Sequence, residues 1–200
     1  MTGNRKAKYA EKALETFKQD GLRLSLDEIS EKIGVTKKTL YNHFDSKEEL
    51  LSECIHTFVL DLKQRMSIMT SADVNAVDGL KCGVDEIAGF FRTLSPVFLS
   101  DIKKMYPEIA NTEHTTGFAF FLEGVKLNLL KGIEEQLFRN DLNVELISQY
   151  FTFSLVSFFI SRVANSSAFL AGDYFNSILD YHLQAIVTEQ GRKLLNSTSR

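Results

Sequence analysis

Apolar residues recur at helical spacing along almost the whole chain, and polar or turn-forming residues separate the runs. The first run extends from about Arg5 to Gln19 and ends at an Asp-Gly pair. Later runs predict helices at about 46–69, 74–93, 96–106, 115–138, 144–165 and 173–189. No stretch alternates between apolar and polar residues in the way a strand does. The pattern predicts an all-α protein, with residues 1–4 as a frayed tail and a polar, disordered end from Gln190.

The stretch from Ser25 to Leu51 contains two short helices, joined by a tight turn, and then the start of a longer helix. In the first short helix, apolar residues recur at i, i+3 and i+7 from Leu26. Gly34 ends that pattern, and Leu40 and Phe44 form the buried side of the second short helix. This order is typical of a helix-turn-helix, whose second helix enters the major groove of DNA.

Helix-capping residues support these boundaries. Ser25 and Glu28 have the spacing of a capping box, in which each residue bonds the backbone N–H of the other. Ser46 and Glu49 repeat that spacing at the start of the long helix. Thr36 is a favourable N-cap for the short helix between them.

That middle helix carries Lys37 and Lys38 in its first turn, where positive charge opposes the helix dipole. The neighbouring helices carry acidic residues at the same place. Two interpretations remain open: the lysines meet an anion such as a DNA phosphate, or they are merely solvated. Their position within this motif favours the anion.

The same stretch resembles the DNA-binding module of the TetR family of bacterial repressors. The resemblance covers roughly a quarter of the chain and depends on many residues in a fixed order. The chain departs from the family pattern at Ser30, Ile33 and Lys38, and these departures leave its base preference open. The matching residues are Ile29, Gly34, Val35, Thr36, Thr39, Leu40, Tyr41, His43, Phe44, Ser46, Lys47, Glu48 and Leu50.

The resemblance implies an N-terminal three-helix module that binds a double-stranded DNA operator, followed by a helical regulatory and dimerisation domain. We place these domains at residues 1–47 and 48–200. Lys47 is expected to meet a phosphate beside the start of its helix. The candidate DNA-contacting residues are Ser25, Thr36, Lys37, Lys38, Thr39, Tyr41, Asn42, His43 and Lys47.

Charge is distributed unevenly between these two parts. The chain has a net charge of −3, but residues 1–44 hold nine Lys and Arg against six Asp and Glu. Some of these basic residues, namely Arg5, Lys6, Lys8 and Lys12, are near the start of the first helix, within reach of phosphates or simply solvated. A basic N-terminal part on an acidic remainder is typical of a DNA-binding module fused to another domain.

The composition argues against several other classes of protein. The two cysteines, Cys54 and Cys82, form no disulfide framework and are expected to be reduced core residues. The most apolar uncharged span, residues 146–161, is too short to cross a bilayer, and no signal peptide is evident, so we expect a cytoplasmic protein. The four histidines do not cluster in sequence, and no catalytic or metal-binding motif is present. We therefore expect neither an enzyme nor a bound cofactor.

The C-terminal part is a candidate site for a small-molecule ligand. Thirteen of the sixteen phenylalanines lie after residue 89, on helices that would surround a cavity. Phenylalanine at helical spacing is more often core, and the charged residues nearby are more often solvated, so that alternative stays open. The candidate ligand-binding residues are Cys82, Glu86, Arg92, Phe121, Glu123, Lys126 and Asn128.

The predicted helix at 144–165 is apolar around most of its circumference, which indicates burial on several sides. A partner subunit would cover what the chain itself does not, although burial within one subunit is the alternative. The candidate residues of a homodimer interface are Phe151, Phe158, Phe159, Phe175 and Ile178.

Together these features predict a DNA-binding transcriptional regulator. The leading hypothesis is a homodimeric repressor that a small-molecule ligand releases from a near-palindromic operator. The alternative is a DNA-bound structural or adaptor protein of the same fold that recruits a protein partner.

Overall fold

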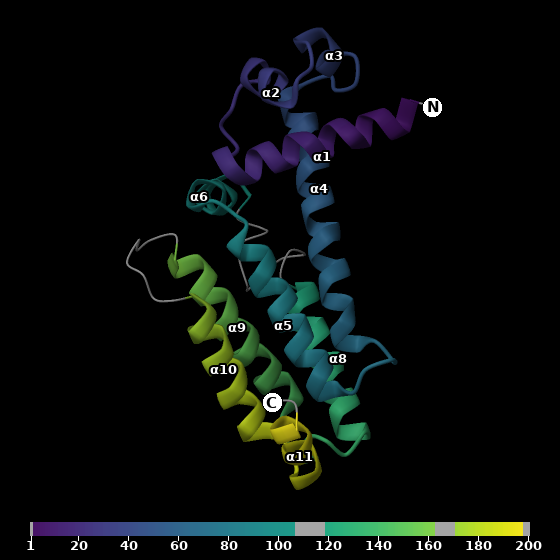
Figure 1. The fold of residues 1–200 in the computed structure, drawn as a ribbon, viewed down its shortest axis with the longest axis vertical. Helices are drawn as coiled ribbons and strands as arrows, with labels where there is room; N and C mark the ends of the chain where they lie inside the picture. Colours follow the sequence, from purple (N-terminus) through teal and green to yellow (C-terminus); the bar gives the residue numbers. More distant parts are fainter. Residues whose placement is uncertain (1, 107–118, 163–170, 198–200) are drawn as a thin grey trace.

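The computed structural model describes residues 2–106, 119–162 and 171–197, and the side chains of 5–106, 119–155 and 176–196. The described residues form helices and contain no strand, which confirms the predicted all-α class (Figure 1). The helices are α1 (Thr2–Asp20), α2 (Leu26–Ile33), α3 (Lys37–Tyr41), α4 (Lys47–Met66), the 3-10 helix η1 (Ser67–Thr70), α5 (Ala76–Arg92), α6 (Pro96–Met105), α8 (Ala119–Glu134), α9 (Val144–Arg162), α10 (Ala171–Ile186) and α11 (Glu189–Ser197).

Helices α1, α2 and α3 form a small module with the first part of α4 at one end of the molecule (Figure 1). Helix α1 packs across α4, and the Cys54 thiol on α4 donates a hydrogen bond to the Ala10 carbonyl at 3.3 Å. The module has a continuous apolar core that includes Ala13, Phe17, Leu22, Ile29, Leu40, Phe44 and Leu50.

Helix α4 continues without a break from this module into the rest of the molecule (Figure 1). Its Phe58 ring lies 5.3 Å from Phe90 on α5 and 5.4 Å from Phe98 on α6, measured between ring centroids. The predicted boundary between residues 47 and 48 falls in the first turn of this helix, and the buried residues of α4 belong to one apolar core that runs from the module into the body. The division into two domains at that point stays a prediction.

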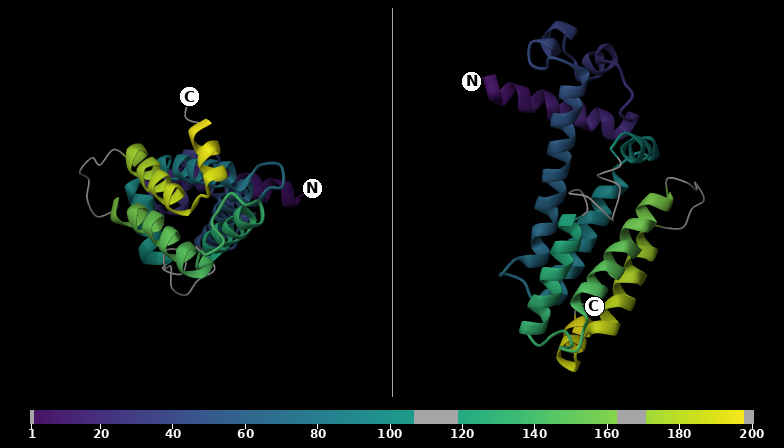
Figure 2. Two further views of the ribbon diagram at one scale, coloured as in Figure 1. Left: turned by 90° about the horizontal axis from the view of Figure 1, so that it is seen from below. Right: turned by 180° about the vertical axis from the view of Figure 1, so that it is seen from behind.

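The remaining helices form the body of the molecule. Helices α4, α5 and α8 pack together, and α9 and α10 lie side by side along one flank of the body in both side views (Figures 1 and 2). The short helix α6 sits between the body and the N-terminal module, in contact with α1. This arrangement places two helices, α4 and α6, between the body and the N-terminal module.

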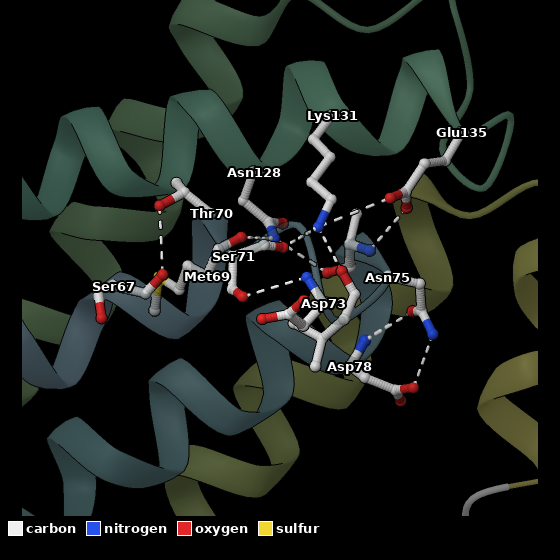
Figure 3. A network of polar contacts seen from close by, with 12 residues as sticks. Ser67, Met69, Thr70, Ser71, Asp73, Asn75, Asp78, Asn128, Lys131 and Glu135 are labelled. Atoms are coloured by element: carbon white, nitrogen blue, oxygen red, sulfur yellow. Dashed lines mark hydrogen bonds and ion pairs between the residues drawn. The ribbon is translucent and has the colours of Figure 1, made fainter.

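A network of polar contacts from α8 holds the segment that joins α4 to α5 (Figure 3). The buried Asn128 side chain donates from Nδ2 to the carbonyls of Met69 at 2.7 Å and Ala76 at 3.0 Å. The Lys131 ammonium donates to the carbonyls of Ser71 and Val74. These bonds satisfy backbone groups that a loop would otherwise leave unpaired, and they fix the lower end of α4 against α8.

Three predictions about individual segments are wrong. Helix α1 already begins at Thr2, so residues 2–4 are not a tail. The chain from Glu189 to Ser197 is the helix α11, because Leu195 is buried against the body and Leu194 packs beside it. Cys82 lies on the exposed side of α5, whereas Cys54 is buried as expected.

Candidate nucleic-acid interface

Helix α3 is positioned by the turn before it and by its own cap. Gly34 adopts a φ of 72°, the left-handed conformation that ends α2, and its N–H bonds the carbonyl of Glu31. The Thr36 side chain then accepts a hydrogen bond from the Thr39 N–H at 3.1 Å, and the two threonine hydroxyls are 2.8 Å apart. Leu40 is fully buried beneath the helix. Helix α3 is therefore short but held in place by its cap and by Leu40, and Lys37, Lys38 and Tyr41 are exposed on it.

Lys37 is held by an acidic residue of the preceding helix. Its Nζ lies 2.8 Å from Asp27 Oδ1 and 5.9 Å from the centre of the Tyr41 ring. The hydrogen bond with Asp27 raises the pKa of Lys37 above its ordinary value. The charge of Lys37 is thus partly neutralised within the module by Asp27, a partner that the sequence pattern did not predict.

Lys38 and Lys47 differ from Lys37, since neither side chain has a hydrogen bond or ion pair with another described residue. Lys38 is exposed on α3, and Lys47 begins α4, where Ser46 caps the helix by accepting from the Glu49 N–H at 3.1 Å. Unpaired cations on an exposed recognition helix and at a helix N-terminus are suited to DNA phosphates and base edges.

The other predicted contact residues have varied surroundings. Tyr41 is 48% exposed and Asn42 is also exposed, whereas His43 packs against Tyr9 of α1 with ring centroids 5.1 Å apart. Ser25 is exposed, but its hydroxyl and its N–H both donate to the Glu28 carboxylate, at 2.7 and 2.8 Å. These bonds lower the pKa of Glu28 and complete the predicted capping box.

Helix α1 adds basic side chains to this end of the molecule. Lys6 pairs with Glu49 of α4 at 2.6 Å, and that hydrogen bond raises the pKa of Lys6 and lowers the pKa of Glu49. Arg5, Lys8 and Lys12 are exposed and have no such partner among the described residues. Lys6 therefore ties α1 to α4, and the other three remain available to an anionic partner.

The structure does not bring the seven candidate ligand-binding residues together. Phe121 and Asn128 are buried in the body, and the Oδ1 atom of Asn128 has no hydrogen-bond partner among the described residues. Cys82, Glu86, Arg92 and Glu123 are exposed, and Glu86 bonds Arg65 at 3.2 Å. Lys126 pairs with Glu145 at 2.7 Å, which raises the pKa of Lys126. Ligand binding by this set stays a prediction, and Phe121 and Asn128 are its two interior members.

Two of the five candidate interface residues have described side chains. Phe151 on α9 is fully buried, and Ile178 on α10 is half-buried beside it in a surface groove. The side chains of Phe158, Phe159 and Phe175 lie outside the described residues. The dimer interface itself stays a prediction.

Three residues that the sequence reasoning did not select have distinctive contacts. Asp27 neutralises Lys37, as described above. Asp101 on α6 is 3% exposed and accepts from the Leu22 N–H at 2.9 Å. His182 on α10 is 6% exposed, and burial lowers its pKa to about 4. No local motif marks any of them, because their partners are distant in sequence or on other helices.

Among the described residues, no helix combines the length and the apolar composition that a bilayer-spanning helix requires. The same residues also contain no group of three or more His, Cys, Asp or Glu side chains placed to hold a metal ion.

Comparison with known proteins identifies the N-terminal module. Residues 11–54 match the family described as "Bacterial regulatory proteins, tetR family". The chain is 22% identical to the uncharacterized HTH-type transcriptional regulator YvaF of Bacillus subtilis over 88% of this chain and 94% of that protein. It is 27% identical to the HTH-type transcriptional repressor KstR2 of Rhodococcus jostii over 73% of this chain and 74% of that protein.

The whole fold is also shared with solved structures. SmeT, the repressor of a multidrug efflux pump of Stenotrophomonas maltophilia, superposes in its triclosan complex with a TM-score of 0.66. The match covers 92% of this chain and 93% of SmeT at 16% identity. The family match, the related regulators and the capped, exposed helix α3 all indicate a helix-turn-helix at the N-terminal end. Residues 11–54 are therefore identified as a module of the TetR family, and the chain as a whole is similar in sequence and fold to bacterial transcriptional regulators.

Proposed function

We propose that this regulator is a homodimeric repressor that binds a near-palindromic operator and leaves it when a small molecule binds the body. The observation that carries the proposal is the seated, outward-facing helix α3, joined to the body through the unbroken helix α4. One such helix per subunit reads one half-site, and half-sites lie about 34 Å apart on DNA. A change in the spacing of the two α3 helices would therefore change operator affinity.

Within the DNA complex, we assign different roles to the side chains of the module. Lys38, Tyr41 and Asn42 project from α3 and would read base edges. Thr36, Thr39, Lys47 and Ser25 would contact the sugar-phosphate backbone near the helix N-termini, where N–H groups favour an anion. Lys37 and His43 are held by Asp27 and Tyr9, so we assign them to the edge of the contact.

A repressor is the form of regulator that the relatives support. KstR2 and SmeT are both named as repressors, and the structure of SmeT with triclosan is a complex with a small molecule. In the present chain, Phe121 and Asn128 of α8 are the interior candidates for contact with such a ligand. The adjacent Gly124 faces the Met66 side chain at the lower end of α4, so a ligand at α8 would act directly on α4.

Two contacts would carry a ligand-induced change from the body to the DNA-binding end. The first is α4 itself, and the second is Asp101 of α6, which bonds the Leu22 N–H and the Arg23 guanidinium at 3.1 Å. A ligand shifts the equilibrium only by the difference between its affinities for the two arrangements. A coupling of about 1–3 kcal/mol would change operator affinity roughly 5–150-fold.

The test begins with DNA from the promoter of the regulator's own gene. Binding is measured by fluorescence anisotropy on that DNA and on a scrambled duplex, and a thermal-shift screen then supplies a ligand. We expect preferential binding to the promoter DNA and a loss of affinity as the ligand saturates the protein. Gly124→Phe, which pushes against Met66, should abolish the response while operator binding remains measurable.

Two results would contradict parts of the proposal. Equal affinity for promoter and scrambled DNA at several salt concentrations would show that this promoter is not the operator. Constant operator affinity through ligand saturation would eliminate the sensor and favour a DNA-bound adaptor that recruits a protein partner.

A further inference from the structure

Side chains of α8 bind the joining segment, residues 67–76, which leads from α4 into the first residue of α5 (Figure 3). Asn128 and Lys131 lie one turn apart on α8, and each donates to two backbone carbonyls of this segment. The two bonds from the Asn128 amide measure 2.7 and 3.0 Å. The accepting carbonyls are those of Met69 and Ala76 for Asn128, and of Ser71 and Val74 for Lys131.

Glu135, on the next turn of α8, completes this network. Its carboxylate accepts from the Ala76 N–H at 2.7 Å and lies 3.6 Å from the Lys131 ammonium. Asn128 is fully buried, yet its Oδ1 atom has no hydrogen-bond partner among the described residues. A buried acceptor without a partner is costly. The contribution of Asn128 therefore comes from its two donated bonds, which fix the joining segment.

Close packing leaves the joining segment little room to shift. A methyl group on Gly79 of α5 would lie 3.2 Å from the carbonyl oxygens of Ile68 and Met69. The Met69 side chain is fully buried, and a methyl group on Gly83 would lie 2.3 Å from it. The segment is thus pressed against α5 on one side while its carbonyls are bonded from α8, and a displacement would break those bonds.

The joining segment also fixes the lower end of α4. The 3-10 helix η1 begins at Ser67, directly after Met66, the last residue of α4. The 20 residues of α4 span about 30 Å, and the helix-turn-helix lies at the opposite end (Figure 1). A displacement of the joining segment would therefore tilt α4 and move α3.

We propose that Asn128 and Lys131 are positioning residues for operator binding. Their bonds to the joining segment form a lock that sets the tilt of α4, and with it the spacing of the two α3 helices in the homodimer. The inference rests on the proposed function and adds to it the residues that define the operator-binding arrangement.

Loss of the lock has a specific consequence for DNA recognition. Without the bonds from α8, α4 samples several tilts, so only a fraction of the dimers has the spacing that one operator requires. The side chains of α3 are unchanged, and they still read the same half-site. The lock therefore controls the distance between half-sites and not their sequence.

Selection of binding sites from a library of random duplexes separates these two properties. Each protein is selected separately, and the enriched sites are compared for half-site sequence and for the distance between half-sites. Lys131→Met and Asn128→Leu remove the donors from side chains of similar size. Lys131→Arg retains donors at the same place. Lys193→Met is the control, because it removes an exposed lysine of α11 that takes no part in this network.

We expect the wild-type protein, Lys131→Arg and Lys193→Met to enrich one spacing of the half-sites. Lys131→Met and Asn128→Leu should enrich the same half-site at a wider range of spacings. On the wild-type site, the affinity of Lys131→Met should fall roughly threefold to thirtyfold, in the range of one or two hydrogen bonds. Its affinity for random DNA should stay unchanged, because that binding depends on phosphate contacts.

Circular dichroism checks that each variant is folded. If Asn128→Leu does not fold, Lys131→Met decides the test, since the Lys131 side chain is 19% exposed and reaches the surface.

Each alternative result contradicts something specific. Lock variants that enrich the wild-type spacing with unchanged affinity overturn the lock and leave the proposed operator intact. Lock variants that lose the half-site sequence as well would show that the network supports α3 itself, which also overturns the assigned role. A wild-type protein that enriches no paired half-sites overturns the proposed operator and, with it, the lock.

Discussion

Three lysines of the DNA-binding end differ in what surrounds their ammonium groups. Lys37 is paired with Asp27, whereas Lys38 and Lys47 have no partner among the described residues. We expect Lys47→Ala to weaken binding to all DNA sequences alike. The slope of log affinity against log salt concentration, called the salt slope, should become shallower by about one. Lys38→Ala should instead change the preferred base, and Asn42→Ala should do the same. Lys37→Met should have the smallest effect, because Asp27 already offsets its charge.

The measurement is anisotropy on operator and random duplexes across a salt series. Asp27→Asn is the control for Lys37, since it frees the ammonium without altering the lysine and should make the salt slope steeper. Equal losses on operator and random DNA for Lys38, Asn42 and Lys47 variants would contradict these separate roles.

His182 makes stability depend on pH in a narrow window. Burial lowers its pKa from 6.5 to about 4, so in the folded state the ring stays neutral where an unfolded chain binds a proton. The free energy of unfolding should therefore fall as the pH drops from about 6.5 towards 4, by a total on the order of 3 kcal/mol.

Urea unfolding at fixed protein concentration, measured between pH 7.5 and 5, tests this expectation. Most carboxylates titrate below that range. His182→Phe keeps an aromatic ring on Phe151 but lacks the titrating group, so its stability should change less with pH. Parallel curves for the two proteins would show that His182 is not the cause.

At the scale of single helices, two glycines provide a matched pair. A methyl group on Gly132 of α8 would lie 2.0 Å from the Phe138 ring, and Phe138 is 1% exposed and unable to move aside. Gly132→Ala should therefore destabilise the protein by about 1–3 kcal/mol. Gly89 of α5 has only the end of the Arg92 side chain within 4 Å, so Gly89→Ala should stabilise by about 0.5–1 kcal/mol. Urea midpoints that move in the same direction for both variants would contradict this.

The order of the helices follows from the sequence because most of them have amphipathic patterns and recognisable caps. Thr36 and Ser46 cap α3 and α4 as expected, and the Ser25–Glu28 capping box forms. The expected second box is not closed, because the Glu49 carboxylate accepts from the Asp45 N–H and not from the Ser46 N–H. Helix α11 was missed because Leu194 and Leu195 are too few to form a periodic pattern, and their contacts come from distant elements.

Of the candidate site, the α3 residues could be predicted from the sequence because the helix-turn-helix motif is local. The environments of Asp27, Asp101 and His182 depend on tertiary contacts, which no local pattern records.

At the scale of the whole molecule, Asp101 joins the body to the DNA-binding end. Its carboxylate accepts from the Leu22 N–H, directly after Gly21, whose φ of 88° forms the α1–α2 turn. Asp101→Ala would leave that N–H unpaired, at a cost of about 1–3 kcal/mol. Hydrogen exchange should then accelerate at Leu22 while the amides of α9 stay unchanged. Arg23→Ala removes only the exposed partner and should have a smaller effect. Unchanged exchange at Leu22 in Asp101→Ala would show that this contact does not restrain the turn.

The proposed dimer makes a separate prediction at this scale. Tyr181 is 76% exposed in the single subunit, so Tyr181→Glu places no charge in the subunit core. A two-fold interface across α9 and α10 would bury that charge without a partner, and the variant should sediment as a folded monomer. Leu60→Glu changes a residue of α4 that is 51% exposed and should leave the dimer intact. A dimeric Tyr181→Glu protein would show that this position lies outside the interface.

The two cysteines give the molecule a built-in reporter of local opening. Cys82 is exposed, and a thiol reagent should modify it at once. Cys54 is bonded to Ala10 in the contact between α1 and α4, and burial raises its pKa to about 12. A thiol in that state reacts only when α1 separates from α4. The rate of the slow phase, which comes from Cys54, therefore reports how often α1 separates from α4. The amplitude of the fast phase, which comes from Cys82, shows in the same sample that the reagent is active.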